Sequence, residues 1–384
     1  MDTAATRKRE CSVDAPVLFL AFELGNTEWK LGFSVGFGQQ PRVRTISARD
    51  LEGLQREIDL ARKRFGLPET ARVMSCYEAG RDGFWLHRYL AGAEIQNLVV
   101  DSSSIEVNRR FRRAKTDRMD VAKLLDLLMR FERGEKKVWR VVRVPSLEAE
   151  DRRHLHRALE DLKVDRTQHI NRMKGLLAGQ GVRIEEIGAG FPDQLDATRL
   201  WDGRPIPDGL KARLEREYER LQFTQGQIRK LEAERREAIR RSKDPGVEKV
   251  RKLLRLKGIG LNGAWVDTME FFAWRDFRNG KEVGGLAGLA ATPYQSGQSS
   301  RERGMSKAGN RHVRALAIEI AWGWLRYQPE SELSQWYQRR FGEGSSRVRK
   351  IGIVALARKL LIALWRYLET GLIPKGAVLK TRLT

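Results

Sequence analysis

The first third of the chain alternates short apolar runs with amphipathic segments. Short, continuously apolar runs are typical of strands in a buried sheet, and five of them predict strands over residues 17–22, 29–37, 42–46, 72–77 and 95–100. Apolar residues recur every three or four positions in three other segments, which predicts helices over residues 49–65, 84–90 and 116–131. The order β-β-β-α-β-α-β-α predicts an α/β fold, a mixed sheet with helices packed on its faces.

Four carboxylates lie at the ends of these elements. Glu23 and Glu78 follow the first and fourth predicted strands, and Asp117 and Asp120 lie three residues apart at the start of the third predicted helix. That spacing places both aspartates on one face of the helix, and open α/β sheets have their sites at the carboxyl ends of the strands. Adjacent carboxylates repel each other unless a cation lies between them, and Mg²⁺ prefers such oxygen ligands. Spacing alone favours a solvated, acidic first turn, whereas the four acids together favour a metal site.

Past the predicted sheet the pattern becomes helical. Apolar positions at helical spacing, among many charges, predict two long helices over residues 147–177 and 210–241, joined by the Gly/Pro-rich segment 182–207. Apolar positions spaced by sevens predict an antiparallel helical hairpin or a dimerising coiled coil. His154 and His156 face different sides of the first helix, so we expect both to be solvated.

The last third carries candidate contacts for phosphate. Gly258-Ile259-Gly260 lies between two predicted helices, and the amides of such a helix-hairpin-helix turn can meet a phosphate, although simple helix packing explains the pattern equally well. Further on, small and hydroxylated residues that include Ser296 precede a dense run of cations, which we interpret as a loop that contacts a nucleic-acid backbone. A flexible basic loop without chemistry is the alternative. The candidate phosphate contacts in this third are Arg301, Arg303, Lys307, Arg311 and Arg314, and Lys115 and Arg118, interleaved with Asp117 and Asp120 in the first third, are two more.

Composition indicates a polyanionic partner. Lys and Arg number 73 against 50 Asp and Glu, a net charge of +23, which is typical of nucleic-acid binding, with acidic lipid as the competing partner. No apolar run reaches the roughly 20 residues of a membrane span, and the apolar run at 17–22 is too short for a signal peptide. Two cysteines exclude a disulfide framework and a Cys-built zinc site, and the histidines show no metal-ligand spacing, so any metal is held by oxygen. We expect a cytoplasmic protein.

The patterns divide the chain into four segments. We expect a disordered basic leader over residues 1–15, a catalytic α/β domain over 16–145, a coiled-coil or dimerisation region over 146–245, and a C-terminal domain over 246–384 that carries Ser296.

The order and spacing of these motifs resemble the transposases of the insertion-sequence 110 family, relatives of the Piv and MooV invertases, over essentially the whole chain. The residues that match the family's acidic tetrad are Glu23, Glu78 within Tyr77-Glu78-Ala79-Gly80, and Asp117 and Asp120 within Lys115-Thr116-Asp117-Arg118-Met119-Asp120. The matching C-terminal motifs are Gly258-Ile259-Gly260, Gly288 to Pro293, Ser296-Gly297 and Ser306-Lys307-Ala308-Gly309. Two departures stand out. Glu23 occupies a position that is usually Asp in the family, and two extra residues precede Pro293.

The resemblance implies a RuvC/RNase H-like mixed-sheet domain, a coiled-coil helical hairpin and a mainly α-helical C-terminal transposase domain with a helix-hairpin-helix-like element. It implies an Mg²⁺-dependent transposase, prokaryotic and cytoplasmic, that cuts and rejoins DNA at an insertion-sequence end and its target. Mn²⁺ is expected to substitute for Mg²⁺. It also implies guidance by a bridge RNA and a homodimer that assembles into a tetramer. The family's catalytic serine corresponds to Ser296, whose attack leaves a phosphoserine link to DNA, and the tetrad binds the metal.

Two other functions stay open. A protein that keeps the tetrad but uses water as the nucleophile would be a RuvC-like nuclease or junction resolvase, with Ser296 as a phosphate contact. A metal site weakened at Glu23 would leave a non-catalytic DNA- or RNA-binding protein. No histidine lies near Ser296 in the sequence to act as a base. Activation of the serine must therefore come from a tetrad in another domain, and that domain can belong to another subunit.

Overall fold

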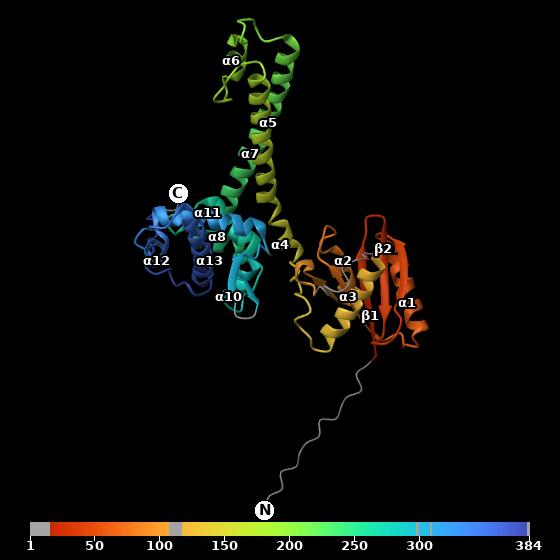
Figure 1. The fold of residues 1–384 in the computed structure, drawn as a ribbon. Coiled ribbons are helices and arrows are strands. Elements are labelled where there is room, and N and C mark those ends of the chain that lie inside the picture. The colour runs from red at the N-terminus through yellow and green to blue at the C-terminus, as the bar shows by residue number, and fades with distance from the viewer. Residues whose placement is uncertain (1–15, 107–116, 297–298, 308, 382–384) are drawn as a thin grey trace, which may run out of the picture. The chain divides into compact units, whose positions relative to one another are not determined.

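The structure, a computed structural model, describes residues 16–106, 117–296, 299–307 and 309–381, and for residues 117–119, 292–296 and 299–303 it describes the backbone alone. The predicted leader at residues 1–15 therefore lies outside the described residues. The chain divides into two compact units, Met1–Val144 and Pro145–Thr384, whose elements are labelled in Figure 1. The predicted boundary between a coiled-coil region and a C-terminal domain stays a prediction.

The first unit is built on a five-stranded sheet in the order β3-β2-β1-β4-β5. Its strands are β1 (Val17–Leu24), β2 (Glu28–Ser34), β3 (Arg42–Ser47), β4 (Arg72–Glu78) and β5 (Gln96–Val100). β1 pairs antiparallel with β2, and β2 antiparallel with β3, whereas β4 is parallel to both β1 and β5. The five predicted strands and the mixed sheet of an α/β fold are confirmed.

Helices cover both faces of this sheet. The helical elements of the unit are α1 (Leu51–Arg64), α2 (Trp85–Gly92), the short η1 (Ser102–Ser104) and α3 (Asp117–Glu132). Alternate residues of β1 enter two separate cores, because successive side chains of a strand point to opposite faces. Leu20 and Phe22 pack with residues of α1 and α2, whereas Phe19 and Ala21 pack with residues of α3.

The second unit begins with a helical hairpin. Its elements are α4 (Leu147–Asp151), α5 (His154–Ala178), α6 (Phe191–Ala197) and α7 (Asp208–Arg241). Figure 1 shows α5 and α7 side by side, with α6 at the end where they are joined. Apolar residues of the three helices, among them Leu177, Phe191 and Leu214, share one core. The two long helices are confirmed, except that the first is interrupted after α4.

The remaining elements include the helices that enclose the largest apolar core of the second unit. They are α8 (Pro245–Leu254), α9 (Leu261–Asp267), the π-helical turn η3 (Thr268–Phe272), α10 (Gly280–Leu286), β6 (Ala291–Ser296), β7 (Ser299–Met305), α11 (Arg311–Tyr327), α12 (Glu332–Phe341) and α13 (Ser346–Thr370). Helices α8 and α9 flank Gly258, whose φ of 90° only glycine adopts easily. The phosphate-binding role of this turn stays a prediction. None of the described helices combines the length and apolar content that a membrane crossing requires.

The predicted loop around Ser296 is wrong, because β6 and β7 form an antiparallel β-hairpin. Ser296 pairs with Ser299, and only two residues, which lie outside the described set, separate these strands. Thr292 and Tyr294 are good strand formers at alternate positions, whereas the polar composition of the second strand hid the pattern. Pairing of β6 with β7 satisfies the backbone hydrogen-bonding groups of both strands, and it does so whether their side chains are polar or apolar.

Gly32 of β2 lies against α3, and we expect Gly32→Ala to lower the free energy of unfolding. An added Cβ would overlap the side chain of Val121 and lie 2.9 Å from Leu125 Cδ1. Overpacking of this kind costs about 1–3 kcal/mol, which urea unfolding of the purified protein would measure. Gly36→Ala is the control, because its Cβ would meet no heavy atom within 4 Å. Equal stability of the two variants would contradict the packing of α3 on β2.

Candidate functional site

Glu23 and Glu78 occupy matching positions at the carboxyl ends of two neighbouring parallel strands. Phe22 of β1 pairs with Tyr77 of β4, and the two glutamates are the next residue on each strand. Neighbouring strands lie about 4.8 Å apart, so the two glutamate backbones are side by side. Strand alternation directs both glutamate side chains to the face opposite Phe22, which is the face that α3 covers.

Helix α3 runs antiparallel to β4 across that face. Its last residue, Glu132, forms an ion pair with Arg72 at the start of β4. Farther along β4, the Cys76 thiol donates a hydrogen bond of 3.8 Å to the carbonyl oxygen of Leu124. Moving toward the carboxyl end of β4 therefore corresponds to moving toward the N-terminus of α3. The first turn of α3 is directed to the edge of the sheet where the two glutamates lie.

Asp117 and Asp120 both lie in this first turn of α3. Asp120 is partly buried, whereas the structure describes Asp117 by its backbone alone. Among the described side chains no three acidic, histidine or cysteine groups are placed to hold one metal ion, a set that leaves out Asp117. The four-carboxylate metal site therefore stays a prediction. Two strands end at this edge of the sheet, and α3 begins there.

The donor groups at this edge suit a hard cation. Burial raises the pKa of the Cys76 thiol, and the negative charge of Glu78 raises it further. A thiol must be deprotonated to bind a metal, so Cys76 is inert at physiological pH. Carboxylate oxygens are then the candidate donors, and these are the ligands that Mg²⁺ prefers.

Ser296 is the last residue of β6, next to the turn of the β6–β7 hairpin. The structure describes its backbone but not its hydroxyl group. Two predicted phosphate contacts, Arg301 and Arg303, lie on β7 of the same hairpin. Of the predicted contacts, the structure gives only the backbone of Arg118, Arg301 and Arg303, and Lys115 lies outside the described residues. The roles of these residues stay predictions.

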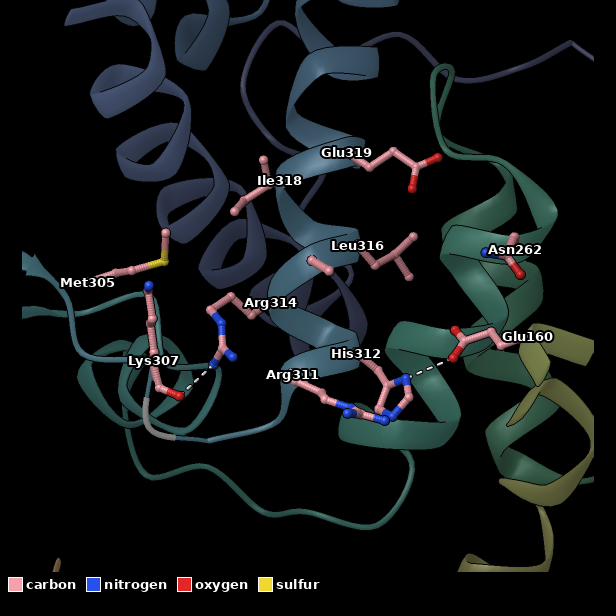
Figure 2. Close-up of a pocket in the computed structure, with 11 residues that line it drawn as sticks. Glu160, Asn262, Met305, Lys307, Arg311, His312, Arg314, Leu316, Ile318 and Glu319 are labelled. Atoms are coloured by element: carbon pink, nitrogen blue, oxygen red, sulfur yellow. Dashed lines mark hydrogen bonds and ion pairs between the residues drawn. The ribbon is translucent and has the colours of Figure 1, made fainter. Parts of the chain in front are cut away.

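The structure brings three other predicted contacts, Lys307, Arg311 and Arg314, into one pocket of about 610 Å³ at the start of α11 (Figure 2). Lys307 has a φ of 55°, and its carbonyl oxygen accepts a hydrogen bond of 2.9 Å from Arg314 Nη1. The pocket also contains acidic groups, and Figure 2 shows Glu160 of α5 directed toward His312, whose Nδ1 lies 2.8 Å from the Glu160 carboxylate. The charge of this pocket is therefore mixed.

The fully buried carboxylate of Glu270 joins three elements next to this pocket. It accepts hydrogen bonds from Arg157 Nε at 2.7 Å and from Asn310 Nδ2 at 2.9 Å, and His156 Nε2 lies 2.9 Å from Oε1. Burial raises the pKa of Glu270, but the hydrogen bonds from His156, Arg157 and Asn310 outweigh it and hold this pKa well below its usual range. The carboxylate is therefore ionised at physiological pH.

Asn310 connects the Glu270 cluster to the pocket. Its Oδ1 accepts hydrogen bonds from the backbone amides of His312 at 2.9 Å and Val313 at 3.2 Å, which caps the N-terminus of α11. The cap fixes where α11 begins, and hence where Arg311 enters the pocket.

Sequence reasoning missed most of this cluster. The expectation that His156 is solvated is wrong, since its exposed fraction is 1% and its ring contacts Glu270. The two residues are 114 positions apart, so no local periodicity relates them. The Asn310 cap had a sequence signal, because Asn immediately precedes an apolar-periodic segment.

Residues 250–337, which include Glu270, Ser296 and the pocket cations, match the family model described as "Transposase IS116/IS110/IS902 family". The chain is 40% identical over 383 residues to y4rJ of Sinorhizobium fredii, a protein whose name places it among transposases, and the match covers 96% of each chain.

Two further relatives carry transposase names. The chain is 27% identical over 241 residues to a Pseudomonas aeruginosa protein named as a family 20 transposase, covering 62% of this chain and 69% of the relative. It is 24% identical over 214 residues to the transposase for insertion sequence element IS1328 of Yersinia enterocolitica, covering 55% and 60%. The relatives define a class of transposases. Within that class, the chain belongs to the IS116/IS110/IS902 family, which supports a DNA transposase role.

We expect Glu270→Gln to destabilise the second unit by about 2–3 kcal/mol, the range for losing hydrogen bonds to a charged group. The folded-state pKa of Glu270 is depressed, so its contribution is present above the ordinary value of 4.5 and is lost as pH falls toward the folded-state pKa. Urea unfolding from pH 7 to about pH 3 should show a nearly constant difference between variant and wild type above 4.5, which narrows as the pH falls below that value. Glu319→Gln, an exposed change on α11, is the control and should leave stability within about 0.5 kcal/mol. A difference that widens in acid would contradict the assignment.

Proposed function

We propose that this transposase cuts and rejoins DNA through Ser296, with Glu23, Glu78, Asp117 and Asp120 as an Mg²⁺-binding tetrad on a RuvC-like first unit. The observation that carries the tetrad is the parallel register of β1 and β4, which aligns the two glutamates at one edge of the sheet. The antiparallel course of α3 directs both aspartates to that edge. A strand order of β3-β2-β1-β4-β5, with helices on both faces, supports the RuvC/RNase H-like assignment.

The chemistry of the serine accounts for rejoining as well as cutting. The Ser296 oxygen forms a bond to phosphorus, and the hydroxyl proton passes to a base. The bond from phosphorus to one deoxyribose oxygen breaks, and that oxygen takes up a proton and leaves as a hydroxyl. The phosphoserine link retains the energy of the broken bond. A deoxyribose hydroxyl from a second DNA end can therefore reverse the step and form a new phosphodiester bond without an outside energy source.

The tetrad supplies the charge that a serine hydroxyl needs. Bound Mg²⁺, or Mn²⁺ in its place, would stabilise negative charge on the phosphoryl oxygens and lower the proton affinity of a nearby hydroxyl. Glu78 and Asp120 are accessible to such an ion, since Glu78 is exposed and Asp120 only partly buried. Glu23, one methylene longer than the usual aspartate, reaches the same edge from β1.

We also propose that a guide RNA selects the donor and target sequences, and that the protein acts as a homodimer that assembles into a tetramer. The net charge of +23 supports binding of more than one nucleic acid. The long α5–α7 hairpin presents exposed apolar residues such as Val164 and Phe223 (54% and 69% exposed), which suit a contact between subunits.

We expect Ser296→Ala to abolish a covalent protein–DNA adduct that the intact protein forms with donor DNA, guide RNA and Mg²⁺. A denaturing gel detects the adduct, and mass spectrometry of the digested protein identifies the modified serine. Ser299→Ala, which removes the hydroxyl of the paired residue on β7, is the matched control and should still form the adduct. An adduct with Ser296→Ala would overturn the assignment. Free 5′-phosphate ends without any adduct would instead select the water-using nuclease or junction resolvase.

We expect Asp120→Asn to reduce adduct formation by more than about 10-fold, since even groups that only orient metal ligands are worth about 10–100-fold. Asp126→Asn, an exposed change farther along the same helix, is the matched control and should have no effect. Adduct yields are compared over a titration of Mg²⁺ and of Mn²⁺. Wild-type yields from Asp120→Asn at every metal concentration would remove Asp120 from the tetrad.

A further inference from the structure

A second basic surface lies where the end of β7 meets α12 and α13, outside the pocket of Figure 2. Two adjoining pockets of about 750 and 630 Å³ share Gly304, Met305, Arg347 and Ile351 in their walls. We call this surface the α13 groove and define it by the residues that carry its chemistry. They are Trp336, Arg347, Lys350, Ile351, Arg358 and Lys359.

The cations of the α13 groove are available to a ligand. Arg347, Lys350 and Lys359 are exposed, and Arg358 is partly buried. Among the described residues, no acidic side chain lines either pocket, and none of the four cations takes part in an ion pair. The pocket at the start of α11 differs, because Glu160 and Glu319 line it.

The groove also offers an apolar surface beside its cations. The Trp336 ring is partly buried and has Lys359 Nζ 4.7 Å from its centroid, and Ile351 is 58% exposed. Arg347, Ile351 and Arg358 follow one face of α13 over eleven positions, which corresponds to about 16 Å of helix. Covering Ile351 and the Trp336 ring with an apolar surface releases water favourably, and aromatic side chains are surfaces on which unpaired bases stack.

We propose that the α13 groove binds a single strand of DNA, with its phosphates on Arg347, Lys350 and Lys359 and its bases against Trp336 and Ile351. Cations beside an aromatic surface are the combination that holds single strands, because the phosphates and the faces of unpaired bases are both available. A duplex keeps its base faces stacked inside and would leave the apolar part of the groove uncovered. The groove borders Met305, the last residue of the hairpin strand that pairs with the Ser296 strand. The proposal rests on DNA as the partner of a transposase and is independent of the nucleophile.

The test compares two double variants of the full chain. Arg347→Gln/Lys350→Gln removes two exposed cations of the groove, and Arg349→Gln/Arg366→Gln removes two exposed cations of α13 outside it. Fluorescence anisotropy measures binding of a labelled 20-nucleotide single-stranded DNA, the same sequence as duplex, and the same sequence as RNA, each over a salt titration. The groove variant should bind single-stranded DNA several-fold more weakly, with a salt slope lower by about 1.4, because each single-strand phosphate contact contributes about 0.7. The control variant should keep the wild-type slope.

Four outcomes would overturn the proposal. These are unchanged binding of single-stranded DNA by the groove variant, an equal loss in the control variant, a loss confined to duplex, and a loss confined to RNA. Sedimentation of both variants without DNA tests whether a second copy of the chain occupies the groove instead, and dissociation of the groove variant alone would show that it does.

Photo-crosslinking locates the strand directly. A single-stranded DNA that carries 4-thiothymidine is irradiated with the wild-type protein, and the cross-linked peptide is identified by mass spectrometry. Cross-links within residues 336–359 support the proposal, and cross-links only elsewhere contradict it. Anisotropy and photo-crosslinking both measure binding of DNA and do not depend on cleavage. Their results therefore test the groove even if Ser296 proves not to be the nucleophile.

Discussion

The buried carboxylate of Glu270 is the interaction on which the second unit depends. An ionised carboxylate without partners would cost far more than a fold of this size can tolerate, so the elements that supply its partners must stay together. Arg157 and His156 come from α5, and Asn310 comes from the turn before α11. The carboxylate itself lies on a π-helical turn, a rare geometry that often marks functional sites. The Glu270 carboxylate therefore fixes the contact between the start of α5 and the start of α11, the helix that carries Arg311 and Arg314.

The first unit depends on a different constraint, the packing of α3 over the parallel strands. Gly32 has no side chain where Val121 approaches, which lets the helix lie close to the sheet. The ion pair between Glu132 and Arg72 lies at the far end of α3, so the first turn of this helix is the one toward the carboxyl ends of the strands. The carboxyl ends of β1 and β4 and the first turn of α3 consequently lie at one edge of the sheet, which is where open α/β sheets have their sites.

The cationic surplus is distributed unevenly over the second unit. In the pocket at the start of α11 acids accompany the cations, and Arg314 is held by the backbone of Lys307. The α13 groove combines an aromatic side chain with cations that form no ion pair among the described residues. A recombinase must hold DNA ends between cutting and rejoining. Separate surfaces for a backbone and for an unpaired strand suit that requirement better than one continuous basic face.

The sequence alone determined the strands and helices of the first unit, the two long helices of the second, and the positions of Glu23 and Glu78 just after two strands, whereas their alignment came from the β1–β4 pairing. The strands and helices depend on periodicities of two and about 3.6 residues, which are local and survive in any context. Tertiary structure alone decided that the segment around Ser296 pairs as a hairpin and that His156 is buried against Glu270. It also decided that the cations of α13 face Trp336 across a groove. The contact between His156 and Glu270 joins residues 114 positions apart, and the buried carboxylate is stable only when that partner is present. The hairpin is local, but its second strand is polar, so backbone pairing rather than an apolar pattern defines it.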